Sequence, residues 1–369
     1  MLDRLKELFA PKINTIGLEI AAERINIIQM RKQGQVYKLV KFITEEVPEG
    51  IFADGQIMDS PALAELLQET LAKHNINNTS KVITALPMRE AIIRIIPIPA
   101  ELDDAELKDM VLNHEAGLYL PYPREEVDID YQKLGYFVDE DGIEKVQVLL
   151  VATRTEITDM YLETFRQAQL QVDVLDINSF ALIRTIREQL RQFGSKEAAV
   201  LVDIEFDSTE IAIIVDGVPQ FSRTVSIGTF QLQQALSQAM NLPASRNTEL
   251  LQGMTIPTNM PVDSTRTGAT GINPGMAALL RVLSELADEL KRSIDFYLNQ
   301  SGELEVAQLF LAGPGGGLGQ LDEFFGQRLS IPSMAIDPVA SLALEHNEEL
   351  TQMQRPAMGI ILGLGMRGV

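Results

Sequence analysis

The 369-residue sequence contains no cysteine and only three histidines, and its basic side chains are far outnumbered by acidic ones. The missing cysteines exclude disulfide bonds, thiolate catalysis and cysteine-ligated metals. The histidines, His74, His114 and His346, share no metal-ligand spacing, which argues against a zinc site or a histidine-based triad. Lys and Arg total 31 against 52 Asp and Glu, and the formal net charge of −21 opposes binding to nucleic acid or anionic lipid.

Long hydrophobic runs are missing as well. No stretch approaches the roughly 20 apolar residues of a membrane span, and the first residues lack the layout of a secretory signal. We therefore expect a cytoplasmic protein without a transmembrane segment of its own. The opening MLDRLKELFAPK predicts a short amphipathic helix that ends at Pro11. Its charges cancel, which favours packing on the protein or a partner over membrane binding.

What is present is the composition of a packed globular protein, with 46% hydrophobic and 22% charged residues and a length that suits two domains. Three β-like runs open the first half, and the short turns between them predict an antiparallel meander. The strands predicted in this half are residues 13–20, 24–31, from Gln35, 81–86, 91–98, 127–135, 145–152 and 171–177. The predicted helices are residues 61–74, 101–117, 155–169 and a segment ending near Gln192.

The second half of the chain opens in the same way as the first. Residues 198–204, 208–217 and 218–227 predict another antiparallel meander. In each half an acid and an isoleucine end the first strand, at Glu19-Ile20 and Asp203-Ile204. Duplicated units often enclose a site between them. The pattern therefore favours a duplication, although any two β-meanders share part of it.

The rest of the second half combines helices with glycine-rich segments. A stretch rich in Pro, Gly, Thr and Asn has no periodicity and predicts a mobile loop at residues 253–275. Glycine is also dense at 313–317, between a predicted strand and a helix, where backbone amides can approach a phosphate. The remaining predicted elements are helices at 229–240, 276–299, 318–329 and 339–346 and a strand at 306–312.

The residue types of a nucleotide clamp occur in three turns of the chain. Turn amides and hydroxyls bind phosphates, and a carboxylate holds hydrated Mg²⁺. Ser208 and Thr209 are the candidate hydroxyls, and Asp203 is the candidate Mg²⁺ ligand. Each residue also has an ordinary explanation as a solvated acid, a turn former or a helix cap, so only the combination supports a clamp. The three turns span residues 19–23, 203–209 and 313–317.

Five stretches of the sequence resemble the PilM family of type IV pilus assembly proteins, a branch of the actin-like superfamily related to the cell-division protein FtsA. The resemblance covers nearly the whole chain, and LYLPYP is more specific than any of the glycine motifs. The stretches are LFAPK (8–12), GLEI (17–20), HEAGLYLPYPREEVDIDY (114–131), ELKRSIDFY (289–297) and GLGMRGV (363–369).

The resemblance implies an α/β protein with the actin-like, ribonuclease H-like duplicated fold, built as two domains around a nucleotide cleft. The expected domains are residues 1–195, with a small inserted subdomain at about 92–152, and 196–369, with a helical and loop subdomain at about 241–300. It also implies residence at the cytoplasmic face of the inner membrane through partners. Those partners are the N-terminal cytoplasmic peptide of PilN and other pilus assembly proteins.

ATP and Mg²⁺ are implied too, but the chain departs from the family pattern at both phosphate turns. Small hydroxyl residues and glycine are replaced at Ala21 and Glu23, and the usual glycine of the second turn is Glu205, followed by Phe206. A side chain then stands where a backbone should approach a phosphate, which predicts weakened nucleotide binding. The implied nucleotide-binding residues are Glu19, Ala21, Ala22, Asp203, Ser208, Thr209, Gly313, Gly315 and Gly316, with Asp203 also as the metal ligand.

A cytoplasmic adaptor that captures the PilN tail, in the groove between the first domain and its inserted subdomain, is the favoured function. An ATP-dependent phosphotransferase of the sugar-kinase type shares the expected fold and is the alternative. A dinucleotide enzyme built on GPGGGLG is weaker, because that fingerprint should open a βαβ unit. No residue stands out as a base for hydrolysis, so we do not expect an enzyme with fast ATP turnover.

Overall fold

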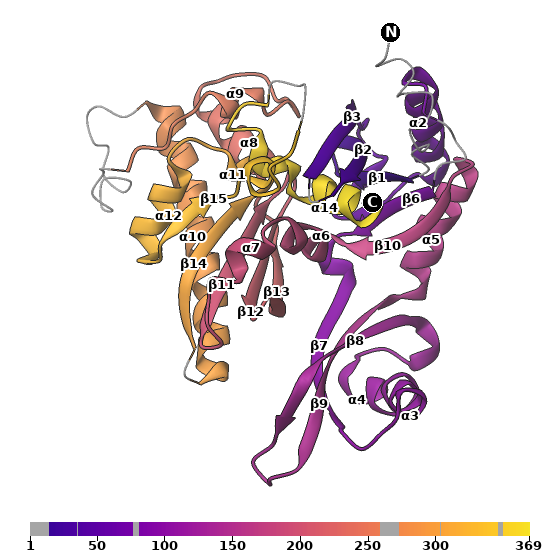
Figure 1. The fold of residues 1–369 in the computed structure, drawn as a ribbon. Coiled ribbons are helices and arrows are strands. Elements are labelled where there is room, and N and C mark those ends of the chain that lie inside the picture. The colour runs from indigo at the N-terminus through magenta and orange to yellow at the C-terminus, as the bar shows by residue number, and fades with distance from the viewer. Residues whose placement is uncertain (1–14, 35, 77–80, 259–272, 303, 346–349) are drawn as a thin grey trace.

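Two five-stranded sheets with the same strand order form the frame of the protein (Figure 1). The structure is a computed structural model that describes residues 15–34, 36–76, 81–258, 273–302, 304–345 and 350–369. The first sheet has the order β10-β6-β1-β2-β3 and the second has the order β13-β12-β11-β14-β15. In each sheet an antiparallel meander of three strands is followed by two parallel strands. This repeated topology confirms the duplication that the sequence favours.

The strands at the centre of each sheet are buried on both faces, which their continuous apolar sequences explain. Every residue of TEIAIIV in β12 is buried, as are the last five residues of TIGLEI in β1. The first sheet comprises β1 (Thr15–Ile20), β2 (Arg24–Gln33), β3 (Val36–Glu46), β6 (Lys81–Leu86) and β10 (Gln171–Ile177). The second comprises β11 (Glu197–Ile204), β12 (Thr209–Val215), β13 (Val218–Val225), β14 (Glu305–Ala312) and β15 (Ser333–Ala335). A small hairpin is formed by β4 (Phe52–Ala53) and β5 (Gln56–Ile57).

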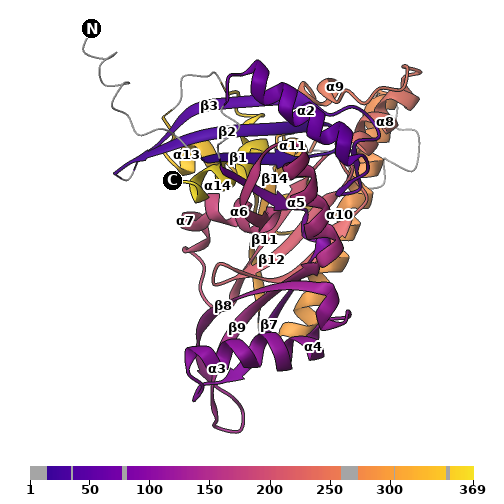
Figure 2. The ribbon, with the colours of Figure 1, turned by 90° about the vertical axis from the view of Figure 1, so that its right-hand side faces the viewer.

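Helices cover both sheets. On one face of the first sheet α2 and α5 lie side by side (Figure 2), and the second sheet carries α8 and α10, which pack against each other. Asp59 begins α2 by accepting a hydrogen bond from the backbone N–H of Ala62. These helices are α2 (Ser60–Lys73), α5 (Thr155–Gln167), α6 (Asn178–Thr185), α7 (Arg187–Leu190), α8 (Thr229–Ala239), α9 (Glu249–Gln252), α10 (Pro274–Ser301) and α12 (Leu321–Leu329).

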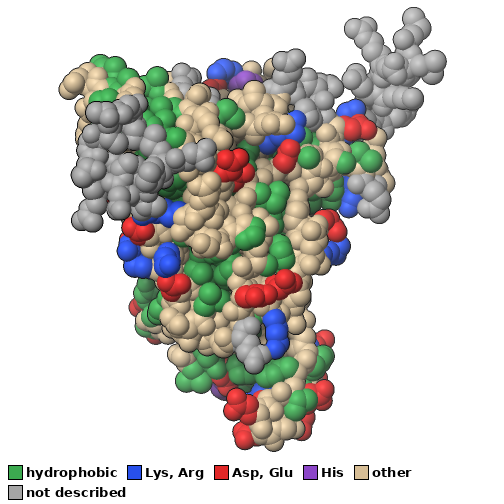
Figure 3. Space-filling view, turned by 90° about the vertical axis from the view of Figure 1, so that its left-hand side faces the viewer, with side chains coloured by type: hydrophobic (Ala, Val, Ile, Leu, Met, Phe, Trp, Pro, Cys, Tyr) green, Lys and Arg blue, Asp and Glu red, His purple; other side chains and the backbone are tan. Residues whose placement is uncertain are grey.

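Residues 91–154 form a separate small unit, at the position where the sequence predicts an inserted subdomain. It extends away from the two sheets (Figure 1) and has a hydrophobic core of its own. Its sheet has the order β7-β9-β8, with β7 (Ala91–Pro99), β8 (Val127–Val138) and β9 (Glu144–Arg154). The helix predicted at 101–117 consists of α3 (Asp104–Asp109), a π-helical stretch (Met110–Glu115) and α4 (Ala116–Tyr119). Figure 3 shows acidic side chains at the far end of this unit, consistent with the exposed Glu140, Asp141 and Glu144.

The C-terminal helix α14 (Gly359–Arg367) returns to the first half of the protein, although the sequence analysis groups it with the second domain. It packs on β1 and α6, on the face of the first sheet opposite α2 (Figure 1). Glycines allow this close approach, because a Cβ atom on Gly17 would lie 2.9 Å from the backbone N of Gly365. The sequence analysis did not predict this helix.

The helix predicted at 339–346 forms only at its start, as α13 (Pro338–Ser341), and His346 lies outside the described residues. Ala343 has a φ of 45°, which ends the helical geometry. The chain then runs along β3, where the N–H of Leu39 donates to the carbonyl of Glu345. Before α14 comes the 3₁₀ helix η5 (Arg355–Met358).

The loop predicted at 253–275 is partly ordered. The N–H of Ile256 donates to the carbonyl of Gly319 at 2.7 Å, which fastens residues 254–256 to the segment before α12. Residues 259–272 lie outside the described part, as does the amphipathic helix predicted within residues 1–14. Across the described residues, no helix combines the length and apolar character that a membrane crossing needs.

We expect Gly363→Ala to destabilise the protein strongly, because the added methyl group would overlap the carbonyl oxygen of Ala181 in α6. Overpacking of this kind costs about 1–3 kcal/mol or more. Urea unfolding followed by circular dichroism should show a lower midpoint than in the wild type. Gly117→Ala, a helical site with nothing within 4 Å, is the matched control and should leave the midpoint unchanged or raise it.

Candidate functional site

The turns that the sequence analysis singles out meet at the junction of the two sheets. The β1–β2 turn and the β11–β12 turn enclose a cavity of about 30 Å³, which is room for only about two water molecules. Four of the predicted residues, Glu19, Ala21, Ala22 and Ser208, belong to its wall, and Arg89 and Glu210 join them. The wall residues used below are Glu19, Ala21, Ala22, Glu205, Asp207, Ser208 and Glu210.

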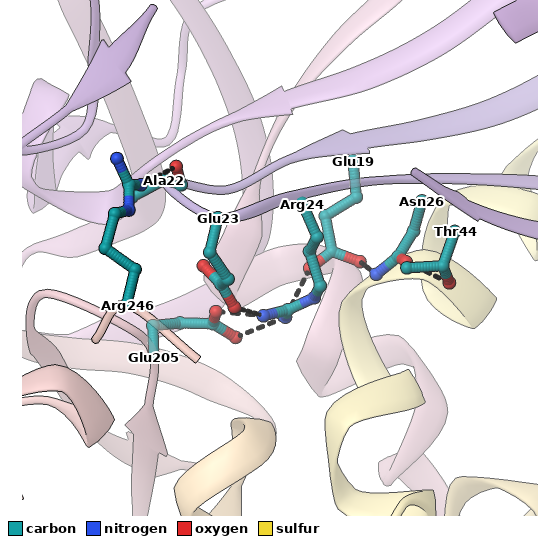
Figure 4. A network of polar contacts seen from close by, with 8 residues as sticks. All are labelled: Glu19, Ala22, Glu23, Arg24, Asn26, Thr44, Glu205 and Arg246. Atoms are coloured by element: carbon teal, nitrogen blue, oxygen red, sulfur yellow. Dashed lines mark hydrogen bonds and ion pairs between the residues drawn. The ribbon is translucent and has the colours of Figure 1, made fainter. Parts of the chain in front are cut away.

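The guanidinium group of Arg24, the first residue of β2, holds the two turns together (Figure 4). It donates to Glu205 at 3.0 and 3.2 Å, to Glu19 at 3.2 Å, and to Glu23. The Arg24 side chain is only 12% exposed, so these are shielded contacts. The neighbouring carboxylates raise the pKa of Arg24 against the opposing effect of its burial. The sequence alone does not indicate Arg24, since nothing in the chain order places it beside Glu205.

The carboxylate of Glu19 begins a second chain of contacts that leads back into the first sheet (Figure 4). Its Oε2 accepts from the side-chain amide of Asn26 at 3.1 Å, and Asn26 in turn accepts from the hydroxyl of Thr44 at 2.8 Å. Burial raises the pKa of Glu19, while Arg24 and Asn26 oppose that rise. Glu19 is therefore held by β2 and β3, and its oxygens are already engaged.

Asp203, the predicted metal ligand, is buried at the end of β11. It is not among the described residues that line the cavity between the turns. Its Oδ1 has no hydrogen-bond partner within the described part of the chain. A Cβ atom on Gly313 would lie 2.6 Å from this oxygen, so Asp203 lies directly against the glycine-rich turn. Burial raises the pKa of Asp203 well above its usual value, and the charges of Glu210 and Glu19 raise it further.

The remaining predicted residues fall into two groups. Ser208 lines the cavity and donates to Asp207, whereas the hydroxyl of Thr209 donates to the carbonyl of Ile227 at 2.6 Å, and so is engaged within the second half. The glycine-rich turn forms the short helix α11 (Gly313–Gly316). Added Cβ atoms there would meet Ile204 at Gly315 and Leu311 at Gly316, which explains both glycines by close packing.

Three further side chains, of Asp207, Glu210 and Arg246, make contacts between the halves. Asp207 Oδ2 accepts from the backbone N–H of Asp54 at 2.8 Å. Glu210 Oε1 accepts from the N–H of Met88 at 2.8 Å. Arg246 donates to the carbonyl of Ala22 at 2.8 Å and lies over the Phe206 ring. Backbone acceptors and donors take part in each contact, and no sequence motif could have indicated them.

A second and much larger cavity, of about 530 Å³, adjoins the turns on the side of the C-terminal segment. That volume is typical of a small-molecule site. Its wall combines polar groups with apolar side chains from both halves of the protein. The wall includes Arg24, Asn26, Phe42, Thr44, Thr229, Pro314, Gly317, Met353 and Gln354.

This architecture, with two sheets of equal topology joined at facing turns and a glycine-rich third turn, is that of an actin-like protein. The ethanolamine utilization protein EutJ from Carboxydothermus hydrogenoformans has the same fold, at a TM-score of 0.55, with 14% identity over 99% of this chain and 96% of that one. MreB 5 of Spiroplasma citri bound to AMPPNP gives a TM-score of 0.54, with 10% identity over 96% of each chain. At these identities the similarity defines the fold alone.

The sequence matches the family model for type IV pilus assembly protein PilM over residues 17–369. The chain therefore belongs to the PilM family. It is also similar to a chain of the structure described as "PilM-PilN type IV pilus biogenesis complex". That similarity has a TM-score of 0.77, with 25% identity over 97% of this chain and 99% of the other.

The fold implies ATP with Mg²⁺, so the residues at the junction can be tested against that ligand. The larger cavity has the volume for a nucleoside, but the turns leave only about 30 Å³ where polyphosphate would lie between them. Four acids, Glu19, Glu205, Asp207 and Glu210, line that space, against one cation, Arg89, and the polar side chains of Asn178 and Ser208. The residues present do not fit magnesium-bound polyphosphate.

Glu210 gives this junction a testable pH dependence. Burial raises its pKa from 4.5 to about 7, while the Met88 N–H and Arg89 oppose the rise and Asp207 adds to it. Between these pH values the folded protein retains a proton that the unfolded chain has lost. The free energy of unfolding therefore falls as pH rises through this interval, by roughly 3 kcal/mol in all for this group.

We expect Glu210→Gln to remove that loss, because glutamine still accepts from Met88 but cannot ionise. The stability of the variant relative to the wild type should grow between pH 5 and pH 8, as measured by urea unfolding at both pH values. Glu69→Gln, at an exposed position of α2, is the control for the loss of one negative charge. A difference that is the same at both pH values would contradict the role of Glu210.

Proposed function

We propose that this chain is a cytoplasmic adaptor of the type IV pilus assembly complex that binds the N-terminal cytoplasmic tail of PilN. Its family and its similarity to a chain of a PilM-PilN complex support this function. The observation that carries the proposal is a groove of about 440 Å³ between the first sheet and the inserted subdomain. This groove is where the sequence analysis expects the peptide.

The groove runs along the edges of two strands. Five consecutive residues of β8, 128–132, line one side, and residues 175–177 of β10 line the other. Residues 151–153 of the central strand β9 line the groove as well. Both β8 and β10 are outer strands of their sheets. Their edges can accept an extended peptide as an added strand.

The side chains of the groove define the chemistry of a suitable tail. Leu149, Val151 and Phe180 offer half-buried apolar surface for alternate side chains of an extended peptide. Asp128 and Asp130 are exposed at the β8 side and favour a basic residue or a terminal amine. The groove thus suits a short tail of mixed apolar and basic character.

Two arginines close the inner end of the groove around one carboxylate. Arg184 and Arg367 each donate to Asp176 Oδ2 at 2.9 Å, and Arg184 also donates to the carbonyl of Gly363 at 2.8 Å. Because Arg367 belongs to α14, these contacts tie the C-terminal helix to the groove wall. The charge of Asp176 is therefore balanced, whereas Asp128, which accepts from the Thr158 hydroxyl, and Asp130 have no ion pair among the described residues.

Leu149→Glu should weaken binding of a synthetic PilN tail peptide by at least tenfold, because the new carboxylate replaces apolar surface beside Asp130. A tenfold change corresponds to about 1.4 kcal/mol, and fluorescence anisotropy measures it directly. Gln147→Glu adds the same charge two residues away on β9, outside the groove lining, and should bind like the wild type. Equal affinities for all three proteins would exclude this groove.

We further propose that nucleotide is not turned over rapidly and that ATP with Mg²⁺ binds weakly, because the acids at the phosphate turns disfavour another anion. Phosphate release from ATP by the purified protein should stay at the background rate, with a heat-treated sample as the control. A phosphorylated sugar detected by mass spectrometry after incubation with ATP would instead favour the phosphotransferase alternative.

A further inference from the structure

Three carboxylates near the β11–β12 turn reach across the junction and bind donors of the first half. Glu205 accepts from Arg24 at 3.0 and 3.2 Å. Asp207 accepts from the N–H of Asp54 at 2.8 Å, and Glu210 accepts from the N–H of Met88 at 2.8 Å. Each contact joins a carboxylate oxygen of the second half to a donor of the first.

A phosphate bound between the two halves would accept hydrogen bonds in the same manner, although Asp54 and Met88 lie outside the β1–β2 turn. An anion held there would accept hydrogen bonds from both halves and so draw them together. Here the acceptors are side-chain carboxyl oxygens of the second half itself. They already occupy the guanidinium of Arg24 and two backbone N–H groups, so these donors are not free for another anion.

Local charge and volume both oppose a polyphosphate at this place. Arg24 is bonded to Glu19 and Glu23 as well as to Glu205, so carboxylates outnumber the cation in this network (Figure 4). Added phosphate would meet net negative charge. The cavity of about 30 Å³ between the turns would also have to expand by displacing one of these side chains.

The two halves are also joined beneath the turns by apolar packing. One continuous hydrophobic core contains Leu201 and Phe310 of the second sheet together with Ile183 and Leu364 of the first half. The rings of Phe193 and Phe310 lie with centroids 6.2 Å apart. The halves are therefore joined both by this apolar core and by the polar contacts at the turns.

We propose that Glu205, Asp207 and Glu210 replace nucleotide phosphates in this chain. They brace its two halves, without a nucleotide, in the closed arrangement, in which the contacts described above join the halves at the turns. Arg24 is the positioning residue for Glu205, because its remaining bonds to Glu19 and Glu23 fix the guanidinium. Arg246 reinforces the brace from the opposite direction through the carbonyl of Ala22. The inference concerns domain closure and does not rest on binding of the PilN tail.

The missing cysteines make the test direct, since two introduced cysteines can be labelled without competing thiols. Glu69→Cys on α2 and Gln327→Cys on α12 lie on exposed surfaces of different halves. Energy transfer between dyes at these sites reports the distance between the halves. In the otherwise wild-type protein we expect one narrow distance distribution that millimolar MgATP or MgADP does not shift.

Glu205→Ala in the labelled protein should lengthen and broaden the distribution, because the contact with Arg24 is lost. Glu205→Gln keeps the side-chain volume and should shift the distance distribution in the same direction by a smaller amount. With two variants, the result does not depend on the folding of one of them. Glu163→Ala breaks an exposed ion pair with Arg166 on α5 and should leave the distribution unchanged.

Two results would overturn the proposal. The first is a shift of the wild-type distance on addition of MgATP, which would mean that nucleotide still closes the cleft. The second is a nucleotide-free distribution in folded Glu205→Gln, checked by circular dichroism, that is the same as in the wild type. In that case the shared apolar core alone would hold the halves together.

Discussion

The buried guanidinium of Arg24 is the contact on which the geometry of the junction depends. A shielded cation is stable only when carboxylates or other acceptors surround it, and here the acceptors come from both halves of the chain. Glu19 and Glu23 belong to the first turn and Glu205 to the second, so the cation fixes one turn against the other. The Asn26 and Thr44 contacts then extend this order across β2 and β3.

Local patterns were sufficient to predict the repeated sheets, because apolar runs such as those of β1 and β11 specify buried strands wherever they occur. They were insufficient for α14, whose Gly363 and Gly365 lower helix propensity but are needed for close packing on α6 and β2. The helix predicted at 339–346 ends early for a related reason. Its sequence is compatible with a helix, but the chain turns at Ala343 and Glu345 pairs with β3.

Sequence placed many of the site residues at the junction but could not assign their partners. Arg24 and Glu205 are separated by 181 residues, and their contact follows from the fold alone. For the glycines, too, the sequence does not say what each residue contacts. Gly313 and Gly315 fit a phosphate-binding turn by sequence, whereas in the structure an added Cβ at either position would overlap Ile204 or Asp203. Close packing within the protein and close approach to a ligand demand the same residue type.

The groove of the first half and the junction between the halves differ in how their polar groups are satisfied. At the groove, two strand edges stay open, and Asp128 and Asp130 remain exposed. At the junction, the protein's own carboxylates take the donors that an anionic ligand would use. If partner binding required a closed arrangement that was seldom populated, its apparent affinity would fall in proportion to that population. A chain braced by its own side chains avoids this loss, so the affinity of the groove is set by the contacts within the groove.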